Sequence, residues 1–240
     1  STSFISMCHY CAIFICVKSV INIKFEMRSD TPEGKDPDAY SPTLKKYHKY
    51  LWSKKTKSGV TLNLNTRKAK VLIHSTSTEE FILSSDAFGH TYRNTKKMSH
   101  IISKVPISEI ESFYSICYTI GAFILFPAKR VNNKVTINAA RGMNAKIGDR
   151  FDLTLECIRL YYLGLENPLK TTFDRYSNFF RLFKDFRGYV DFFLLQDLVD
   201  SNYKNINYWL PFKGFDNPPL PQNVDMYMLY KKNLTNYIKQ

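Results

Sequence analysis

Residues 71–86 read VLIHSTSTEEFILSSD, in which two apolar runs, VLIH and FILS, flank a short polar stretch. This pattern predicts two strands joined by a turn. Apolar and polar residues also alternate over residues 60–64 and 21–27, which predicts two further strands. We therefore expect a small antiparallel sheet in the N-terminal half of the chain.

Helices are expected to dominate the rest of the chain. Ser41 as N-cap and Pro42 at the first helical position are typical of a helix start, and this helix should end near Trp52. Ser108 and Glu111 have the spacing of a capping box for a helix over residues 108–120. The other helices are expected over residues 91–104, 149–164, 168–186, 189–200 and 222–238, with Gly188 between the third and the fourth of these.

Composition predicts one α+β domain over residues 1–240, with a small N-terminal antiparallel sheet and a mostly helical C-terminal half. The chain is 44% hydrophobic and 15% aromatic, which is enough for a substantial core, and no Gly- or Pro-rich linker divides it. We distinguish an extra N-terminal segment (residues 1–22), a basic part that contains the sheet (residues 23–105) and a helical part (residues 106–240).

Positive charge is concentrated in one part of the sequence. The formal net charge is +13, and residues 41–105 hold 13 lysines and arginines against 3 acidic residues. Aromatic residues are interleaved with these cations, as phosphates and exposed bases would require. We therefore expect binding to RNA or another single-stranded nucleic acid, with a solvated basic face as the alternative. The expected ligands are Lys45, Lys46, Lys54, Lys55, Lys96 and Lys97, with Arg141 and Arg150 as a phosphate clamp.

The segment RNTKKMSH presents an arginine, an asparagine and a histidine in that order. This order resembles the signature of HEPN ribonucleases, whose histidine and arginine act on the RNA 2′-hydroxyl and the scissile phosphate without a metal. The resemblance implies catalytic roles for His100, Arg93 and Asn94, and His90 and Asp86 are near enough in sequence to join them. HEPN domains are helical bundles, whereas this motif follows predicted strands, so the alternative is a plain basic helix.

A second enzymatic interpretation rests on the predicted strands. His74 in VLIHSTS and Ser84 in FILSSD resemble the strand-borne motifs of ADP-ribosyltransferases, although no matching glutamate follows on a later strand. Nucleotide-binding loops of the GxxxxGK[ST] and GxGxxG types are absent from the sequence, and no cofactor is expected. Asp152, Glu156 and Arg159 share one face of a predicted helix, where an ion-paired stripe is favoured over a metal or a general base.

The N-terminal stretch combines cysteines with apolar residues. Cys8, Cys11 and Cys16 lie close together, but no second pair of ligands completes a zinc tetrahedron, so no metal is expected. Five cysteines in a chain of this size favour free thiols and a cytoplasmic location. The apolar stretch CAIFICVKSVINI is interrupted by Lys18 and is shorter than the ~20 residues that span a bilayer, so no membrane segment is expected.

Several phrases of the sequence resemble an uncharacterised, mainly bacterial family of unknown function. They are RSDTPEGKDPDAYSPTLKKYHKYLWSK, LSSDAFGHTY, TINAARG, DRFDLTLECIRLYY and GYVDFFLLQDLVD. The similarity covers residues 23–240. It implies a bacterial or phage-like intracellular setting, and it transfers no catalytic residue.

Overall fold

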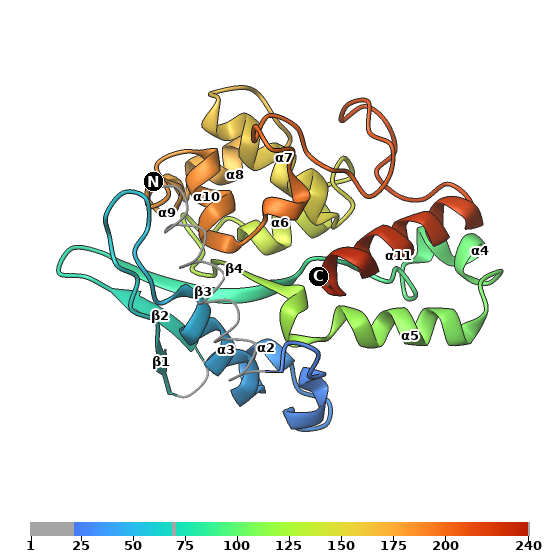
Figure 1. Cartoon of the computed structure of the whole chain (residues 1–240), viewed down its shortest axis with the longest axis horizontal. Helices are drawn as coiled ribbons and strands as arrows, with labels where there is room; N and C mark the ends of the chain where they lie inside the picture. The colour runs from blue at the N-terminus through green and yellow to red at the C-terminus, as the bar shows by residue number, and fades with distance from the viewer. Residues whose placement is uncertain (1–21, 69–70, 240) are drawn as a thin grey trace, which may run out of the picture.

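The computed structural model of the protein describes residues 22–68 and 71–239. An antiparallel sheet lies in the N-terminal half of the described chain, and the C-terminal half is mostly helical (Figure 1), which confirms the predicted α+β class. The sheet has the order β1-β2-β3-β4 and consists of β1 (Asn65–Arg67), β2 (Val71–Ser75), β3 (Glu80–Ala87) and β4 (Phe123–Pro127).

Strands β2 and β3 are the two strands predicted from VLIH and FILS. Their antiparallel register pairs Leu72 with Leu83 and His74 with Phe81, and these four side chains are buried on one face of the sheet. Period-two alternation identifies both strands because only one of their faces is fully buried.

Strand β4 pairs with the second half of β3, where Ile124 lies opposite Asp86. All of its residues are buried. A strand that is buried on both faces shows no alternation in its sequence, so the pattern that identifies β2 and β3 does not identify this one.

The strand predicted over residues 60–64 is wrong. These residues form an extended loop that makes an isolated bridge between Lys55 and Thr61. Leu62 and Leu64 are nevertheless buried. The alternation therefore reflects which side chains enter the core, not pairing with another strand.

The strand predicted over residues 21–27 is wrong for the part that the structure describes. Residue 21 lies outside the described residues, and residues 22–26 make an isolated bridge between Glu26 and Thr119. Met27 is fully buried and begins a short 3-10 helix.

Helices make up most of the remaining regular structure. The described helices are η1 (Met27–Asp30), α2 (Pro37–Tyr40), α3 (Pro42–Trp52), η2 (Lys96–Met98), α4 (Ser99–Ile102), α5 (Ile107–Cys117), η3 (Ile120–Ala122), α6 (Ile137–Met143), α7 (Phe151–Tyr162), α8 (Lys170–Asp174), α9 (Ser177–Arg181), α10 (Phe186–Phe193), η4 (Gln196–Leu198) and α11 (Val224–Lys239).

Helix starts follow the sequence in some places and not in others. The Ser41 hydroxyl accepts a hydrogen bond from the Leu44 N–H at 3.1 Å, so the predicted cap of α3 is confirmed. The predicted capping box of α5 is wrong, because the helix begins at Ile107 and has no side-chain cap. The helices predicted over residues 149–164 and 222–238 are α7 and α11, with slightly different ends.

Two other helix predictions need correction. Residues 91–104 are helical only from Lys96, because Tyr92 has a φ of 57°, a left-handed conformation that an α-helix does not contain. The helix predicted over residues 168–186 is divided into α8 and α9.

Gly188 does not separate two helices. It lies within α10, which begins where the Asp185 carboxylate accepts a hydrogen bond from the Gly188 N–H at 2.8 Å. A Cβ atom on Gly188 would lie 2.0 Å from the carbonyl oxygen of Phe183. The glycine therefore permits a close approach between backbones.

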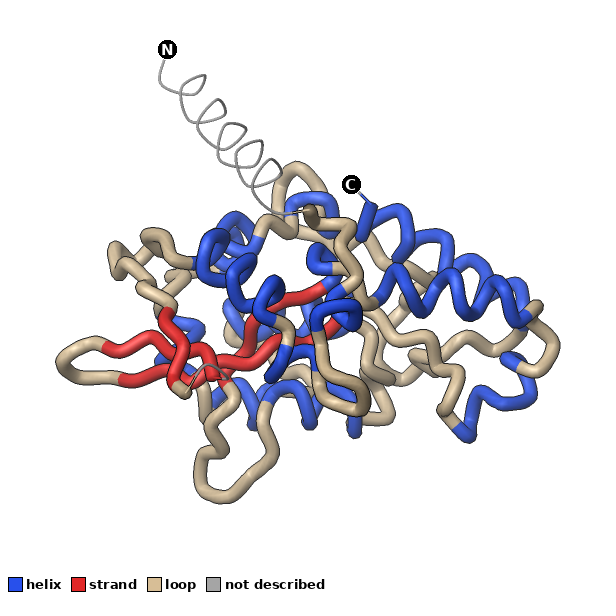
Figure 2. The backbone as a smooth tube through the Cα atoms, turned by 90° about the horizontal axis from the view of Figure 1, so that it is seen from below, coloured by secondary structure: helices blue, strands red, loops and turns tan. Residues whose placement is uncertain are grey.

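The helices enclose the sheet. Figure 1 shows α7, α8 and α10 on one side of the strands and α2 and α3 on the other. α5 and α11 pack against each other beyond the end of the sheet, and the view from below shows them side by side (Figure 2). None of the described helices is long and apolar enough to cross a bilayer.

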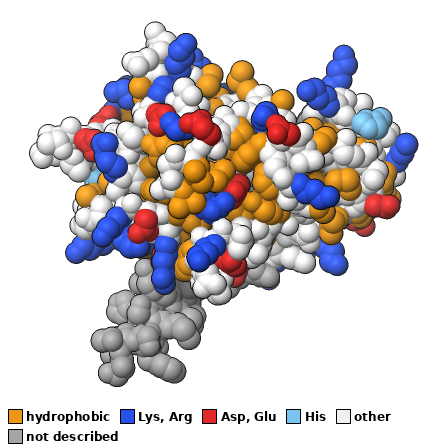
Figure 3. Space-filling model, turned by 90° about the horizontal axis from the view of Figure 1, so that it is seen from above, with side chains coloured by type: hydrophobic (Ala, Val, Ile, Leu, Met, Phe, Trp, Pro, Cys, Tyr) orange, Lys and Arg blue, Asp and Glu red, His pale blue; other side chains and the backbone are white. Residues whose placement is uncertain are grey.

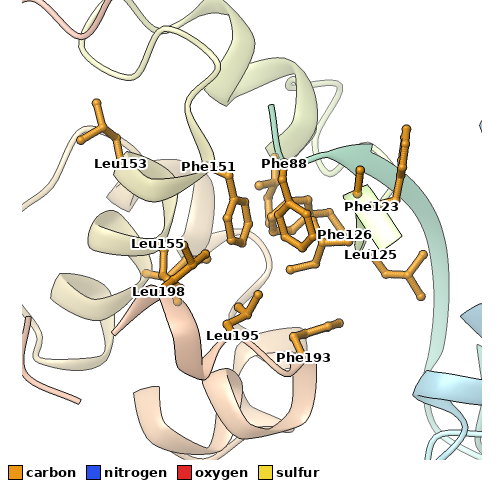
Figure 4. Packing of buried hydrophobic residues seen from close by; sticks show 14 of the residues in the cluster. Phe88, Phe123, Leu125, Phe126, Phe151, Leu153, Leu155, Phe193, Leu195 and Leu198 are labelled. Carbon is orange, nitrogen blue, oxygen red and sulfur yellow. The ribbon is translucent and has the colours of Figure 1, made fainter. Parts of the chain in front are cut away.

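Aromatic side chains join the two halves of the fold. Phe88, which follows β3, packs against Phe151 of α7 with ring centroids 4.7 Å apart, and Phe126 of β4 lies beside them (Figure 4). One cluster of buried apolar residues runs from Met27 to Ile238. That the whole chain forms a single domain stays a prediction, because it means that the chain unfolds as one cooperative unit.

Candidate functional site

The predicted nucleic-acid ligands at the surface fall into two groups that lie apart. Lys46 and Lys55 are exposed in α3 and just after it, and Lys96 and Lys97 are exposed in η2, which leads into α4. α3 and α4 lie far from each other in Figure 1. The face turned away from α3 shows hydrophobic side chains in its middle with scattered lysines and arginines (Figure 3).

Two of the predicted lysines do not project freely from the surface. Lys45 is buried, and its Nζ donates hydrogen bonds to two backbone carbonyls of α2, at 3.0 and 2.5 Å. Lys54 Nζ lies 5.1 Å from the Trp52 ring centroid and 4.8 Å from that of Phe192, and burial lowers the pKa of Lys54 to about 8. Neither ammonium group is placed as a free phosphate ligand.

The predicted clamp of Arg141 and Arg150 does not form at the surface. Both side chains are buried. Arg150 pairs with Asp152 and also donates to a backbone carbonyl at 2.8 Å, while Arg141 pairs with Asp86. Both guanidinium groups balance carboxylates inside the fold, because a buried charge needs a partner.

An open groove of about 530 Å³ lies between α3 and the segment that contains β1, and we call it the α3 groove. Lys46, Lys49 and Tyr50 line it from the helix, and Leu64 and Thr66 line it from the other side. Tyr50 is 55% exposed, and Lys46 Nζ lies 5.9 Å from the centroid of its ring. The groove therefore combines cations with an exposed aromatic ring.

The three proposed catalytic residues of RNTKKMSH, Arg93, Asn94 and His100, do not converge on one site. His100 lines a cavity of about 570 Å³ together with His90, and we call it the His100 cavity. Arg93 is stacked on Tyr114, 3.9 Å from the ring centroid, and neither Arg93 nor Asn94 lines this cavity. The arrangement that the HEPN resemblance implies, in which arginine and histidine face one phosphate, is not found among these described residues.

A second cavity, of about 430 Å³, opens at the C-terminal end of β3, and we call it the β3 cavity. It contains two of the residues predicted from the sequence, Asp86 and His90. Ser84 of the same strand also lines it. Its other polar side chains and its aromatic rings come from distant parts of the chain. They include Asp36, Asp38, Asn138, Asp149, Tyr114, Tyr118 and Phe123.

One guanidinium group joins two carboxylates at the end of β3. Nη1 of Arg141 pairs with Asp86 and lies 3.5 Å from Oδ1 of Asp149, while Nε donates to Thr154 at 3.1 Å. Nη2 of Arg141 has no partner among the described residues. Burial raises the pKa of Asp86 to about 6, although Arg141 acts in the opposite direction. Such a carboxyl group can exchange a proton near neutral pH.

His90 lies between the two cavities and lines both of them, as does Asp149. Its Nδ1 accepts a hydrogen bond from the Tyr92 N–H at 2.9 Å, so the neutral ring carries its hydrogen on Nε2. Burial lowers the pKa of His90, which favours this neutral form. His90 therefore offers a hydrogen-bond donor and is poorly placed to act as a general base.

Asn138 and Asp149 are site residues that the sequence does not reveal. Asn138 of α6 donates to Ser84 Oγ at 3.3 Å and to the Ser85 carbonyl at 3.1 Å, but its Oδ1 is buried without a partner in the described chain. Asp149 follows Gly148, and both have a φ near 60°. The dipeptide Gly-Asp marks a turn, but only the fold brings it to β3.

The ADP-ribosyltransferase interpretation gains no support from the geometry. His74 is buried and stacks on Phe81, with ring centroids 6.1 Å apart, and its Nδ1 accepts a hydrogen bond from the Asn63 N–H at 3.1 Å. Ser84 lies on the opposite face of the sheet, because it is an odd number of positions from Phe81 along β3.

The predicted stripe on α7 is ion-paired. Glu156 binds Arg159 at 2.7 Å, and Asp152 pairs with Arg150. Cys117 and Cys157 are buried free thiols. Over residues 22–68 and 71–239, no group of His, Cys, Asp and Glu side chains could hold a metal ion. The cysteines of the considered zinc site, at positions 8, 11 and 16, lie outside the described residues.

The fold and its cavities define an α+β protein whose antiparallel sheet ends in a cluster of two half-buried carboxylates and one buried guanidinium. Residues 21–240 match the model of a family of unknown function, DUF6994, and the chain belongs to this family. No curated protein and no solved structure matches the chain.

Proposed function

We propose that the protein binds single-stranded RNA through the α3 groove. The observation that carries this proposal is the exposed Tyr50 ring beside Lys46 and Lys49. Among the described residues, no carboxylate forms an ion pair with either lysine. Both ammonium groups therefore remain available for phosphates.

The groove suits a single strand better than a duplex. An unpaired base can stack on Tyr50, which contributes about 1–3 kcal/mol for each stacked base, whereas the bases of a duplex are already stacked. Lys46 and Lys49 lie three positions apart in α3, so they project from the same side of the helix. The proposed binding depends on the backbone and the base face, and it carries little sequence preference.

Neither enzymatic alternative has comparable support. Arg93 and His100 line no common cavity, and His74 and Ser84 lie on opposite faces of the sheet. The cations and the ring of the α3 groove, by contrast, share one surface. We therefore propose a binding module that acts on RNA in the cytoplasm.

Fluorescence anisotropy with a labelled oligouridine tests the proposal. Lys46→Gln/Lys49→Gln should weaken binding and reduce the slope of log K against log salt by about 1.4, since each phosphate contact with a single strand contributes about 0.7. Tyr50→Ala should weaken binding with little change in the salt slope, because stacking releases no counterions.

Lys96→Gln/Lys97→Gln is the matched control, because it removes the same charge far from the α3 groove. If both double variants weaken binding equally, attraction depends on net charge alone and the groove is not the binding surface. Absence of any binding by the unmodified protein at low salt would overturn the proposal.

A further inference from the structure

The β3 cavity contrasts with the overall charge of the protein. The chain carries a net charge of +13, yet the cavity is lined by Asp36, Asp38, Asp86 and Asp149 and by no lysine or arginine. Arg141 pairs with Asp86 and lies 3.5 Å from Asp149, but it does not line the cavity, so a phosphate would meet carboxylates and no lining cation. A nucleotide's phosphate therefore does not fit this cavity, although a donor of hydrogen bonds does.

The polar network around the cavity is incomplete. Oδ1 of Asn138, a lining residue, is a buried acceptor without a partner in the described chain. Nη2 of the fully buried Arg141 is a donor without a partner, beside Asp86 and Asp149. Buried polar groups rarely stay unpaired, and Asn138 lines the cavity whereas Arg141 does not, so the Asn138 oxygen is the atom that a polar molecule in the cavity would reach.

Aromatic rings form another part of the lining. Tyr118 lies between Tyr114 and Phe123, with ring centroids 4.7 Å and 6.3 Å away. Arg28 lies over the Tyr114 and Tyr118 rings and Arg93 over Tyr114, so these rings offer a planar ligand only their remaining apolar surface. The carboxylates and the Asn138 oxygen accept hydrogen bonds from the edge of such a ligand. The volume of about 430 Å³ is within the range of small-molecule sites.

We infer that the β3 cavity binds one amino-bearing nucleobase as the free nucleoside, without a phosphate. The exocyclic amino group donates to the acceptors of Asn138 and Asp86, and the His90 Nε2–H donates to a ring nitrogen or carbonyl of the base. This site is separate from the α3 groove, and the inference does not depend on RNA binding there.

Burial supports this assignment of donors and acceptors. It raises the pKa of Asp86 to about 6 and also raises the pKa of Asp38. Both carboxylates therefore lose solvation in the folded protein, and N–H groups of a ligand would stabilise their charged forms. His90 is held in the tautomer that donates from Nε2 by the Tyr92 N–H.

Isothermal titration calorimetry with free nucleosides tests the inference. Adenosine, cytidine or guanosine should bind with a stoichiometry of one, uridine should bind more weakly because it has no amino group, and the corresponding 5′-monophosphate should bind at least about tenfold more weakly than its nucleoside. Because no RNA is present, failure of the α3 groove proposal would leave this result unaffected.

Ser84→Ile places a larger side chain where Ser84 lines the cavity, and it should abolish nucleoside binding. Ser75→Ile is the matched control on an exposed position of β2 and should bind as the unmodified protein does. If Ser84→Ile fails to fold, the comparison of nucleoside with 5′-monophosphate on the unmodified protein still tests the inference. Absence of nucleoside binding, equal binding of uridine, or tighter binding of the monophosphate would each overturn the inference.

Discussion

Nε2 of His48 in α3 lies 2.7 Å from Oγ of Ser85 in β3. This contact joins the helix to the strand whose C-terminal end opens into the β3 cavity. Nδ1 of His48 accepts a hydrogen bond from the Trp52 indole N–H at 3.0 Å. The histidine is fully buried, and the hydrogen bond at Nδ1 leaves its single proton on Nε2. The folded protein therefore holds His48 in its neutral form.

This contact predicts a loss of stability in acid. Burial lowers the pKa of His48 to about 3 from 6.5, so the unfolded chain binds a proton between these values that the folded chain does not. The stability that depends on neutral His48 is fully present above pH 6.5 and is lost as the pH falls through this window. Urea denaturation of His48→Gln should show a shallower fall in the free energy of unfolding, by up to about 1.4 kcal/mol per pH unit. An unchanged slope would contradict the neutral assignment.

Removal of the cation between two carboxylates should destabilise the end of β3. Arg141→Met leaves the half-buried Asp86 without its cation, and we expect a loss of about 3 kcal/mol in urea denaturation, the lower end of the range for buried pairs. Adding Asp86→Asn should recover part of this loss, because the remaining amide carries no charge. Arg187→Met, which removes an exposed guanidinium beside Asp191, should change stability by less than about 0.5 kcal/mol. If the free-energy changes of Arg141→Met and Asp86→Asn simply add in the double variant, Arg141 and Asp86 are not coupled.

Two glycines inside helices should respond to alanine with opposite signs. Gly188→Ala places a Cβ 2.0 Å from the Phe183 carbonyl oxygen and should cost more than about 2 kcal/mol. Gly142→Ala in α6 meets no atom closer than 3.9 Å and should gain up to about 1 kcal/mol from helix propensity. Thermal denaturation of both variants gives the comparison, and a stabilised Gly188→Ala would refute the close approach.

Tyr230→Phe should loosen the backbone at His90. The Tyr230 hydroxyl accepts from the His90 N–H and donates to the His90 carbonyl, both at 3.1 Å. Its removal should cost about 1–3 kcal/mol and speed hydrogen exchange at the His90 amide. Tyr227→Phe is the control, because the Tyr227 hydroxyl donates to the Thr91 carbonyl and leaves the His90 amide paired. Equal exchange at His90 in both variants would contradict the expectation.

The predictable parts of the fold are those that local chemistry specifies. The sequence around Ser41 and Pro42 encodes the start of α3, and alternation encodes β2 and β3, since each pattern acts within a few residues. Alternation does not identify β4, because both of its faces are buried. The left-handed Tyr92 breaks a predicted helix because tertiary contacts hold it, including the hydrogen bond from its hydroxyl to the Gly148 carbonyl at 2.6 Å.

The candidate site is predictable only in part. Asp86 and His90 are close in sequence and do share a cavity. Arg141 is named from its charge, but sequence alone does not show that Asp86 and Asp149 lie beside its guanidinium group inside the fold. Asn138 reaches Ser84 from 54 positions away, a juxtaposition that no spacing rule reports.

The contacts of α11 with residues 89 and 90 form late, because the ribosome makes the helix long after it makes those residues. Tyr230 holds His90 across 140 positions of sequence, and Leu234 lies so close to Gly89 that a Cβ there would be 1.8 Å from Cδ2 of the leucine. A ribosome that adds about 5–20 residues per second needs roughly 7–28 s to travel from one partner to the other. During that interval the β2–β3 hairpin can pair while the segment after it lacks the helix that fixes it. The wall shared by the two cavities is therefore completed only after α11 has been translated.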